Sequence, residues 1–362
     1  MQLSEHKSPS PEAFRVFIEG VQNLQDYLRT NAGESLVDAE KQLTKSLAVD
    51  PDFAPAQYYK AIVLTHARKA DDAIDLLEGL AQDDSPFKAE VLYNLAFAYA
   101  RKYEYDPCKK SLALLDEAYK YAHYYEFLGA PRIAKRLDLV MLIKAMQAWT
   151  MAVFGGRDLK HPDDFEQRRI KYLPEAEKLA QSVLEDRRLK KLAPDTRIAV
   201  KVEAFNVLGI VNMRMGQYSE QFEQDAYQYW QLSEQYYREA LELHSRDVRV
   251  LDNISTLNLI RASYAYRHEE PDEMIDYATQ AKDTEEKAIS FNLHDRFRWL
   301  NLARCYALLG EWGKAATATK EIPQKPGVPM GEEVKALYNV ISQRDVNPIV
   351  NSYFPVEEKS SS

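Results

Sequence analysis

Pairs of small residues separated by twelve positions recur at distant places in this 362-residue chain. A small residue on an apolar helix allows a second helix to cross closely, because a larger side chain would hold the two backbones apart. A constant offset between two such points predicts a repeated pair of helices joined by a short turn. The three pairs are Ala61 with Ala73, Ala96 with Cys108, and Ala303 with Ala315.

Small residues that open several apolar helices also follow a fixed period. Ala39, Ala73 and Cys108 are separated by 34 and 35 residues, the length of one helix–turn–helix repeat. Glycine supplies only 12 of the 362 residues, and a chain with few turn formers and many helix formers is predicted to be all-α. Because each helix pair leaves an apolar face that only the next pair can cover, we expect the pairs to stack into a solenoid.

One stretch, RWLNLARCYALLGEWGKAATATKEIP, carries a nearly complete repeat pattern. Its large, small and turn positions are Trp299, Leu302, Ala303, Tyr306, Gly310, Ala315 and Pro323. This pattern resembles the tetratricopeptide repeat, in which Trp, Leu, a small residue and Tyr lie on the first helix and Gly ends it. The resemblance implies an α-solenoid of about seven helix pairs with a C-terminal capping helix.

Departures from the regular spacing divide the chain into parts. We expect residues 1–12 to form a flexible N-terminus, residues 13–345 to form the solenoid, and residues 346–362 to form a C-terminal tail. Within the solenoid the sequence predicts regular repeats near 36–120 and 294–323, an irregular pair over 131–193, and a long-helix pair over 195–245.

Glycine and proline give finer expectations within the irregular parts. Gly155, Gly156 and Pro162 predict a loop that separates a helix ending near Phe154 from a partner helix. The stretch from 217 to 244 contains neither Gly nor Pro and is predicted to be one long helix.

The end of the chain shows two further features. Residues 332–343 predict a capping helix after a break at 323–331. Tyr353 and Phe354 follow this helix, and they are expected either to pack back onto the terminal repeat or to dock onto another chain.

The charge balance excludes several classes of partner. Lys and Arg number 47 against 56 Asp and Glu, a net charge of −9, whereas nucleic-acid binders usually carry a basic excess. We find no apolar run of the roughly 18–20 residues that cross a bilayer, and the N-terminus lacks the layout of a signal peptide. The sequence therefore predicts a cytoplasmic protein that binds neither membrane nor nucleic acid.

A search for chemistry finds no catalytic or metal-binding pattern. The seven histidines lack metal-ligand spacing, and Gly155–Gly156 lacks the context of a phosphate-binding loop. Cys108 and Cys305 lie at small, apolar positions of their helices and are interpreted as structural. We therefore expect no enzymatic activity, no cofactor and no metal.

Clusters of like charge receive structural interpretations. The carboxylate pairs Asp71/Asp72, Asp83/Asp84 and Asp163/Asp164 are expected to cap helix starts. The basic residues of two clusters are expected to lie on solvated helix faces. These residues are Arg168, Arg169, Lys171, Arg187, Arg188, Lys190 and Lys191.

The resemblance also implies where a partner would bind, because the first helices of tetratricopeptide repeats line a concave groove. The leading hypothesis is a non-enzymatic scaffold or adaptor that holds a protein or peptide there, and the basic residues favour an acidic ligand. The alternative is a regulatory sensor or a subunit of a larger assembly that uses helices at 131–193 and 217–244 as its interface; the oligomeric state is left open. The positions carried over are Tyr58, Ile62, His66, Tyr93, Asn94, Phe97, Arg101, Asn206, Ile210, Met213, Arg214, Leu300, Asn301 and Arg304.

Overall fold

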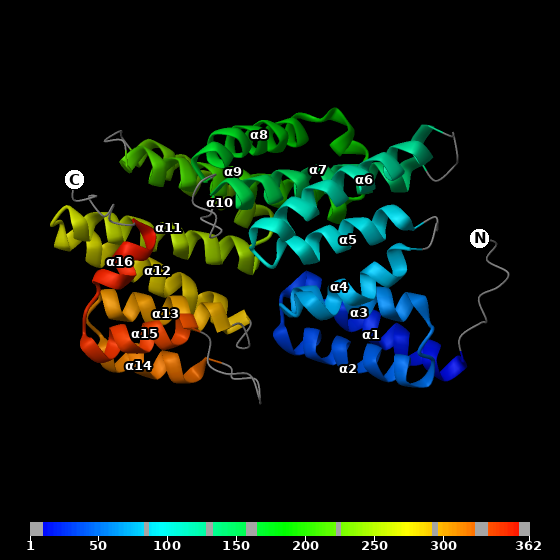
Figure 1. The fold of residues 1–362 in the computed structure, drawn as a ribbon, viewed down its shortest axis with the longest axis horizontal. Helices are drawn as coiled ribbons and strands as arrows, with labels where there is room; N and C mark the ends of the chain where they lie inside the picture. The colour runs from blue at the N-terminus through cyan, green and yellow to red at the C-terminus, as the bar shows by residue number, and fades with distance from the viewer. Residues whose placement is uncertain are drawn as a thin grey trace. The chain divides into compact units, whose positions relative to one another are not determined.

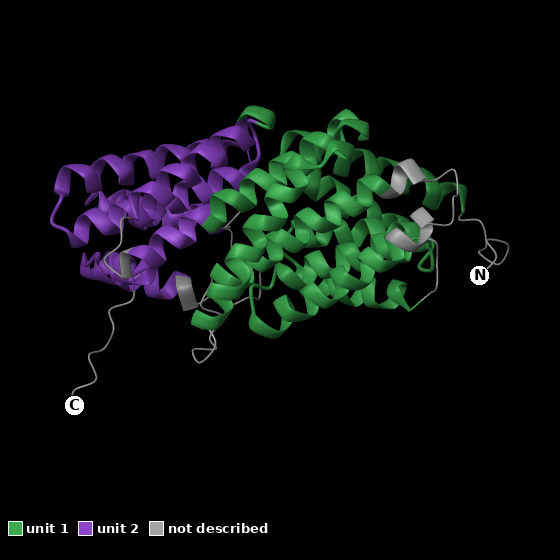
Figure 2. Ribbon diagram, turned by 90° about the horizontal axis from the view of Figure 1, so that it is seen from above, with its two compact units in different colours: residues 1–211, 242–244 green, residues 212–241, 245–362 purple. Residues whose placement is uncertain are grey.

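The computed structural model describes residues 10–82, 87–127, 133–156, 165–221, 226–291, 296–322 and 332–354, and no strand occurs among them. The helices are labelled in Figure 1. The chain divides into two compact units (Figure 2): unit 1 comprises residues 1–211 and 242–244, and unit 2 comprises residues 212–241 and 245–362.

Unit 1 is a series of antiparallel helix pairs. Consecutive helices pack against each other from α1 to α8, and each first helix also contacts the first helix of the next pair. This second set of contacts defines one side of the unit, here named its first-helix face, formed by α1, α3, α5 and α7. The helices are α1 (Pro11–Thr30), α2 (Gly33–Val49), α3 (Ala54–His66), α4 (Ala70–Ala81), α5 (Lys88–Ala100), α6 (Tyr105–Phe127), α7 (Ile133–Gly156), α8 (Phe165–Glu185), the 3-10 helix η2 (Arg187–Lys191), and α9 (Pro194–Gln221), which continues into unit 2.

Unit 2 repeats this arrangement. Helices α11 to α15 pack in chain order, and α13 contacts both α11 and α15, so that the first-helix face of unit 2 includes α11, α13 and α15. The helices are α10 (Tyr227–Leu243), α11 (Val248–Arg267), α12 (Pro271–Phe291), α13 (Arg296–Leu308), α14 (Trp312–Glu321), α15 (Glu332–Gln343) and α16 (Asn347–Tyr353). In the described part of the chain, α1 to α14 thus form the seven pairs predicted, and the all-α solenoid class is confirmed.

The small residues lie at the helix crossings as predicted. Ala61 and Ala73 are fully buried in the core shared by α3, α4 and α5. Gly20 makes the same kind of crossing in the first pair, where a Cβ would lie 2.8 Å from Leu43 Cγ. The remaining members of the twelve-residue pairs, Ala96, Cys108, Ala303 and Ala315, are also fully buried.

A recurring left-handed turn reverses the chain within the pairs. Arg68, Glu269 and Gly310 have φ values of 59°, 59° and 72° and follow first helices α3, α11 and α13. In each turn the next N–H bonds a carbonyl five residues back, as from Glu270 to Ala265 at 2.9 Å. This is the Schellman arrangement, which satisfies carbonyls left open at a helix end.

The pair α11–α12 has this turn although no repeat motif marks it in the sequence. Its turn residue is Glu269 rather than glycine, so the usual signal for the end of a first helix is missing. The N-terminus of α11 is set by Asp247, whose Oδ1 accepts from the N–H groups of Arg249 and Val250. A side-chain cap therefore begins this regular helix pair, and a left-handed turn without glycine joins its two helices.

The prediction of one long helix over 217–244 is wrong. Helix α9 continues past Gly216 to Gln221, Ala226 is not helical, and α10 begins at Tyr227. A Cβ on Gly216 would collide with the indole ring of Trp230. In a continuous helix these two residues would be about 21 Å apart along the axis, so their contact requires the chain to reverse between them.

The prediction of a loop beginning at Gly155 is also wrong. Gly155 and Gly156 form the last turn of α7, and a Cβ on Gly155 would lie 3.0 Å from Tyr172 Cβ on α8. The glycine permits a close helix crossing rather than a turn. The partner helix α8 begins at Phe165 and includes Pro174 in its interior. Pro162 lies outside the described residues.

Helix α7 corrects the expectation that no apolar run reaches membrane-spanning length. Residues Leu137–Gly156 are long and apolar enough to cross a bilayer by length and composition, and 72% of this window is buried inside the structure. Helices α6 and α8 pack on α7. These contacts make α7 a core helix of unit 1.

The capping helix is confirmed as α15, and the break before it, at 323–331, lies outside the described residues. Part of the segment expected to be a tail is helical, because α16 occupies residues 347–353. Ile349 and Val350 of α16 are buried, so the short helix is held by packing on unit 2 rather than by length alone.

Replacing Gly216 by Ala tests the crossing of α9 and α10. The added methyl group must displace Trp230, and overpacking of this kind costs about 1–3 kcal/mol. Gly79→Ala is the matched control, because a Cβ there meets nothing within 4 Å, and it is expected to gain up to about 1 kcal/mol. Urea unfolding monitored by circular dichroism measures both. Equal stabilities for the two variants would contradict the crossing.

Replacing Glu269 by Gly tests the left-handed turn between α11 and α12. Glycine adopts positive φ without strain, so the free energy of unfolding is expected to rise by about 1 kcal/mol. Gly310→Ala, at the equivalent turn, is expected to lower it by a similar amount. Glu270→Gly, one residue beyond the turn, serves as the control and is expected to give no gain. Thermal unfolding of the four proteins provides the comparison.

Candidate functional site

Four aromatic side chains run along the first-helix face of unit 1, one from each first helix. His66 lies between Tyr27 and Phe97, with ring centroids 5.5 and 5.7 Å apart, and Phe97 contacts Trp149 at 6.0 Å. All three contacts are edge-to-face, the arrangement that aromatic quadrupoles favour. We name Tyr27, His66, Phe97 and Trp149 the aromatic ladder. It joins α1, α3, α5 and α7 and supports the polar residues beside it.

A polar pair lies on the same helices. Asn94 Nδ2 on α5 donates to the Tyr58 hydroxyl on α3 at 2.8 Å and to the Glu90 carbonyl at 2.9 Å. Both amide hydrogens are thereby used, and the Asn94 carbonyl oxygen is the atom that can accept from a ligand. Burial and the neighbouring Glu90 raise the pKa of Tyr58, so its hydroxyl stays protonated.

Arg101 lies beside the ladder, at the C-terminus of α5. Its guanidinium carbon lies 5.9 Å from the ring centroids of both Phe97 and Tyr103, and Nη1 donates to the Tyr103 hydroxyl at 3.3 Å. Within the described residues Arg101 pairs with no carboxylate, and its Nε is buried without a hydrogen-bond partner. A half-buried cation of this kind favours an anionic group brought by a ligand.

The structure separates the predicted groove residues by burial. In unit 1, Phe97, Asn206 and Ile210 are buried, as are Met213 and Leu300 in unit 2. The others are half-buried: Tyr58, Ile62, His66, Tyr93, Asn94 and Arg101 in unit 1, and Arg214, Asn301 and Arg304 in unit 2. The structure brings together Tyr58 with Asn94, His66 with Phe97, Phe97 with Arg101, and Asn301 with Arg304.

Sequence reasoning missed two members of the ladder, Tyr27 and Trp149, and the neighbouring Tyr103. The successive ladder residues are 39, 31 and 52 positions apart, so no constant period connects them. The available signal was weaker: each is an aromatic residue in the C-terminal half of an expected first helix.

Where unit 1 has the aromatic ladder, unit 2 has three polar side chains joined by hydrogen bonds. Glu285 on α12 is fully buried and accepts from Asn301 Nδ2 at 2.9 Å, and Asn301 Oδ1 accepts from Arg304 Nη1 at 3.0 Å. Burial and the charge of Asp252 raise the pKa of Glu285 well above its ordinary value of 4.5. Asn301 and Arg304 of the predicted groove are thus tied to a buried acid.

Most of the remaining charged residues have structural roles. Asp71 and Asp72 lie in the first turn of α4, where negative charge suits the helix dipole. The expectation that they cap this helix is wrong, because no side chain of the described residues bonds its first N–H groups, and Asp71 instead pairs with Lys102 at 2.7 Å. The pairs at 83–84 and 163–164 lie outside the described residues. Among the basic clusters, Arg187 and the two lysines at 190 and 191 are exposed as expected.

Arg168 and Arg169 correct the expectation of a solvated basic face, because both are buried. Arg168 Nη1 donates to the Phe154 carbonyl at 2.6 Å, and its guanidinium lies over the rings of Tyr105 and Phe154 at 5.3 and 5.0 Å. The guanidinium is therefore enclosed by aromatic surface and a carbonyl at the end of α7 rather than by water.

The described residues contain no group of three or more His, Cys, Asp or Glu side chains placed to hold a metal. Both cysteines are buried, and burial raises the pKa of the Cys305 thiol. A raised pKa keeps the thiol protonated and weakly nucleophilic.

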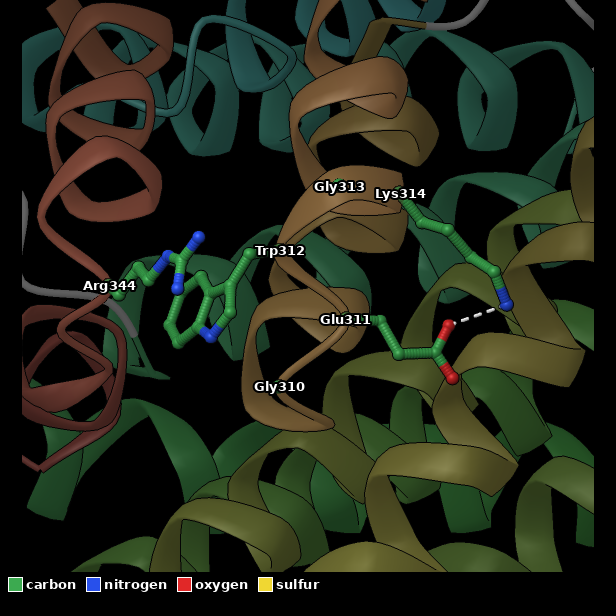
Figure 3. A pocket seen from close by; sticks show the side chains of 6 residues that line it. All are labelled: Gly310, Glu311, Trp312, Gly313, Lys314 and Arg344. Atoms are coloured by element: carbon green, nitrogen blue, oxygen red, sulfur yellow. Dashed lines mark ion pairs between the residues drawn. The ribbon is translucent and has the colours of Figure 1, made fainter.

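A shallow pocket in unit 2 lies where α13 turns into α14. Figure 3 shows the Trp312 indole beside the Arg344 guanidinium, while Glu311 extends toward Lys314, with which it forms a 2.6 Å ion pair. None of the predicted groove residues lines this pocket.

The helix pairs define an α-solenoid of tetratricopeptide-like units. No protein-family model matches the chain. A local stretch is similar to neutrophil cytosol factor 2: the human protein is 33% identical over 96 residues and the Bos taurus protein 34% identical over 95 residues. Each match covers 22% of this chain and 18% of the relative, so it spans about a fifth of the relatives' length.

Three solved structures resemble the chain at 11–13% identity. The apo form of the quorum sensor NprR from B. thuringiensis has a TM-score of 0.45, covering 92% of this chain and 88% of its own. A monomeric mutant of IFIT1 with Gppp-AAAA has a TM-score of 0.40 (93% and 76%). The TPR domain of P58(IPK) has a TM-score of 0.27 (96% and 94%).

The buried acid in unit 2 gives a prediction about pH. Because the folded-state pKa of Glu285 is raised, the unfolded chain releases this proton first as pH rises past 4.5, and unfolding becomes easier. Glu285→Gln removes that proton and can still accept from Asn301. The variant is expected to match wild type near pH 4.5 and to be more stable at pH 8 by at least ~1 kcal/mol, about the value of one pKa unit.

Urea unfolding at several pH values checks this prediction. The exposed neighbour Glu286→Gln is the control and should follow the wild-type pH profile. A constant difference between Glu285→Gln and wild type at all pH values would show that Glu285 is ionised in the folded protein.

Proposed function

We propose that this chain is a non-enzymatic, cytoplasmic scaffold of the tetratricopeptide type that binds a peptide segment of a partner protein on the first-helix face of unit 1. The observation that carries the proposal is Arg101, a half-buried cation with no carboxylate partner among the described residues. It lies over Phe97, the third member of an aromatic ladder that spans four successive first helices.

The chemistry of this face favours an acidic peptide. A ligand carboxylate can pair with Arg101, and a ligand backbone N–H can donate to the Asn94 carbonyl oxygen, two interactions that fix an extended chain. Tyr58, Ile62, His66 and Tyr93 supply the half-buried apolar surface. The buried Phe97 contacts both the His66 ring and the Arg101 guanidinium and thereby supports their positions.

Charge reversal at Arg101 tests the proposal. Full-length wild type, Arg101→Glu and Arg187→Glu are immobilised, incubated with nuclease-treated lysate of the source organism, and the captured proteins are quantified by mass spectrometry. A partner that pairs with Arg101 is expected to be recovered equally by wild type and Arg187→Glu. Its recovery by Arg101→Glu should fall at least tenfold, about 1.4 kcal/mol in binding free energy.

Arg187 is a matched control because it is an exposed arginine of the same unit, in the irregular region. Loss of the partner with Arg187→Glu and its retention with Arg101→Glu would reject the first-helix face. That result would favour the alternative, a subunit or sensor that uses the irregular helices as its interface.

A further inference from the structure

The last described residues of the chain lie on the first-helix face of unit 2. Residues 347–354, here named the C-terminal segment, comprise α16 and Phe354. Helix α16 packs against α11 and α15, and it lies beside α11 in Figure 1. Gln217 Nε2 on α9 donates to the Tyr353 carbonyl at 3.3 Å. A simple terminal cap would contact only the last helix pair, whereas this segment reaches the first helices of two earlier pairs.

The apolar side chains of the segment are inserted among these helices. Ile349 and Val350 are 4% and 1% exposed and belong to one core with residues of α11, α13 and α15. Phe354 is 1% exposed; its ring lies 6.4 Å from that of Tyr264 and 5.2 Å from the Arg267 guanidinium. An aliphatic pair and, four residues later, an aromatic pair therefore anchor the segment.

Polar contacts fix its register. Arg214 Nη1 donates to Gln217 Oε1 at 2.6 Å and thereby orients the amide that binds the Tyr353 carbonyl. The Tyr266 hydroxyl donates to Asn347 Oδ1 at 3.5 Å at the other end of the segment. Burial raises the pKa of the Tyr353 hydroxyl, and the charges of Arg304 and Arg214 act on it in the opposite direction. Two predicted groove residues thus act on the chain's own C-terminal segment, Arg214 through Gln217 and Arg304 through its charge.

We propose that the first-helix face of unit 2 is a peptide-binding surface that the C-terminal segment occupies in the isolated chain. Its partner is a short helical peptide of the same chemistry, with an aliphatic pair followed four residues later by an aromatic pair. The proposal rests on the proposed function in one respect, that first-helix faces of this chain bind peptides. It does not depend on Arg101 or on the aromatic ladder.

The tether makes the segment a strong competitor. Only residues 344–346 separate α15 from α16, and a short connection of this kind gives an effective concentration in the millimolar range. A free peptide at micromolar concentration binds weakly until the segment is released. A substitution that weakens the packing of the C-terminal segment but leaves the first-helix face of unit 2 unchanged should therefore increase the affinity of the protein for a peptide added in solution.

A labelled copy of the segment is the probe. A fluorescein-labelled peptide of residues 345–356, DVNPIVNSYFPV, is titrated with the full-length chain and followed by fluorescence anisotropy. The Phe354→Ala protein is expected to bind this peptide at least tenfold more tightly than wild type. Tyr338→Ala, which removes an exposed aromatic residue of α15, should bind like wild type. A peptide with its own Phe replaced by Ala should bind neither protein.

Val350→Ala is the second variant. It truncates the segment by two methyl groups, leaves Phe354 in place, and should raise the peptide affinity by a smaller factor, so the test survives if Phe354→Ala fails to fold. Hydrogen exchange on wild type gives an independent measurement: saturating peptide should increase the exchange of the amides at 349–354.

Equal affinities of all proteins for the peptide, or no binding to folded Phe354→Ala or Val350→Ala, would overturn the proposal. A concentration-dependent dimer of Phe354→Ala in sedimentation, with no peptide binding, would overturn it in favour of a second copy as the occupant. The probe is a peptide of this chain. A failed lysate capture, which tests the first-helix face of unit 1, therefore does not change the result of this peptide titration.

Discussion

The close crossing of helices at residues with little or no side chain is the interaction on which the rest of the structure depends. Gly20 against Leu43, Gly155 against Tyr172 and Gly216 against Trp230 each occupy a position where one added carbon atom would meet another helix. Interiors packed to crystal-like density cannot absorb such an atom without moving a helix. These crossings set the spacing within pairs, and the spacing allows first helices to contact one another and form a continuous face.

The sequence predicted the helix pairs well because their determinants are local. Small residues twelve positions apart, such as Ala61 and Ala73, identify both helices and the turn between them. The errors came from residues with two possible meanings. Gly155 could end a helix or permit a crossing, and only the position of α8 decides between these. Glu269 adopts a left-handed conformation that short-range patterns assign to glycine, so the regular pair α11–α12 showed no motif.

The candidate site was less predictable for a different reason. Repeat positions indicate which residues face inward, but they do not indicate how deeply each one is buried. Phe97 and Ile210 are buried while Asn94 and Arg101 are half-buried, and Phe97 is covered by rings of two neighbouring helices, His66 and Trp149. In unit 2 the covering element is the C-terminal segment itself, whose sequence carries no repeat pattern. Contacts between parts of the chain far apart in sequence therefore decided which predicted residues remain accessible.

The apolar composition of α7 has a consequence for synthesis. On the ribosome, α6 and α7 emerge before α8, so the surface of α7 that α8 covers is exposed until residues up to Glu185 have emerged as well. At about 5–20 residues per second, this interval lasts several seconds. During that time one side of a twenty-residue apolar helix is exposed to solvent, because α6 is present but α8 does not yet cover it. Binding of the nascent chain by chaperones should therefore peak when Gly156 has emerged from the ribosome and end once α8 has emerged.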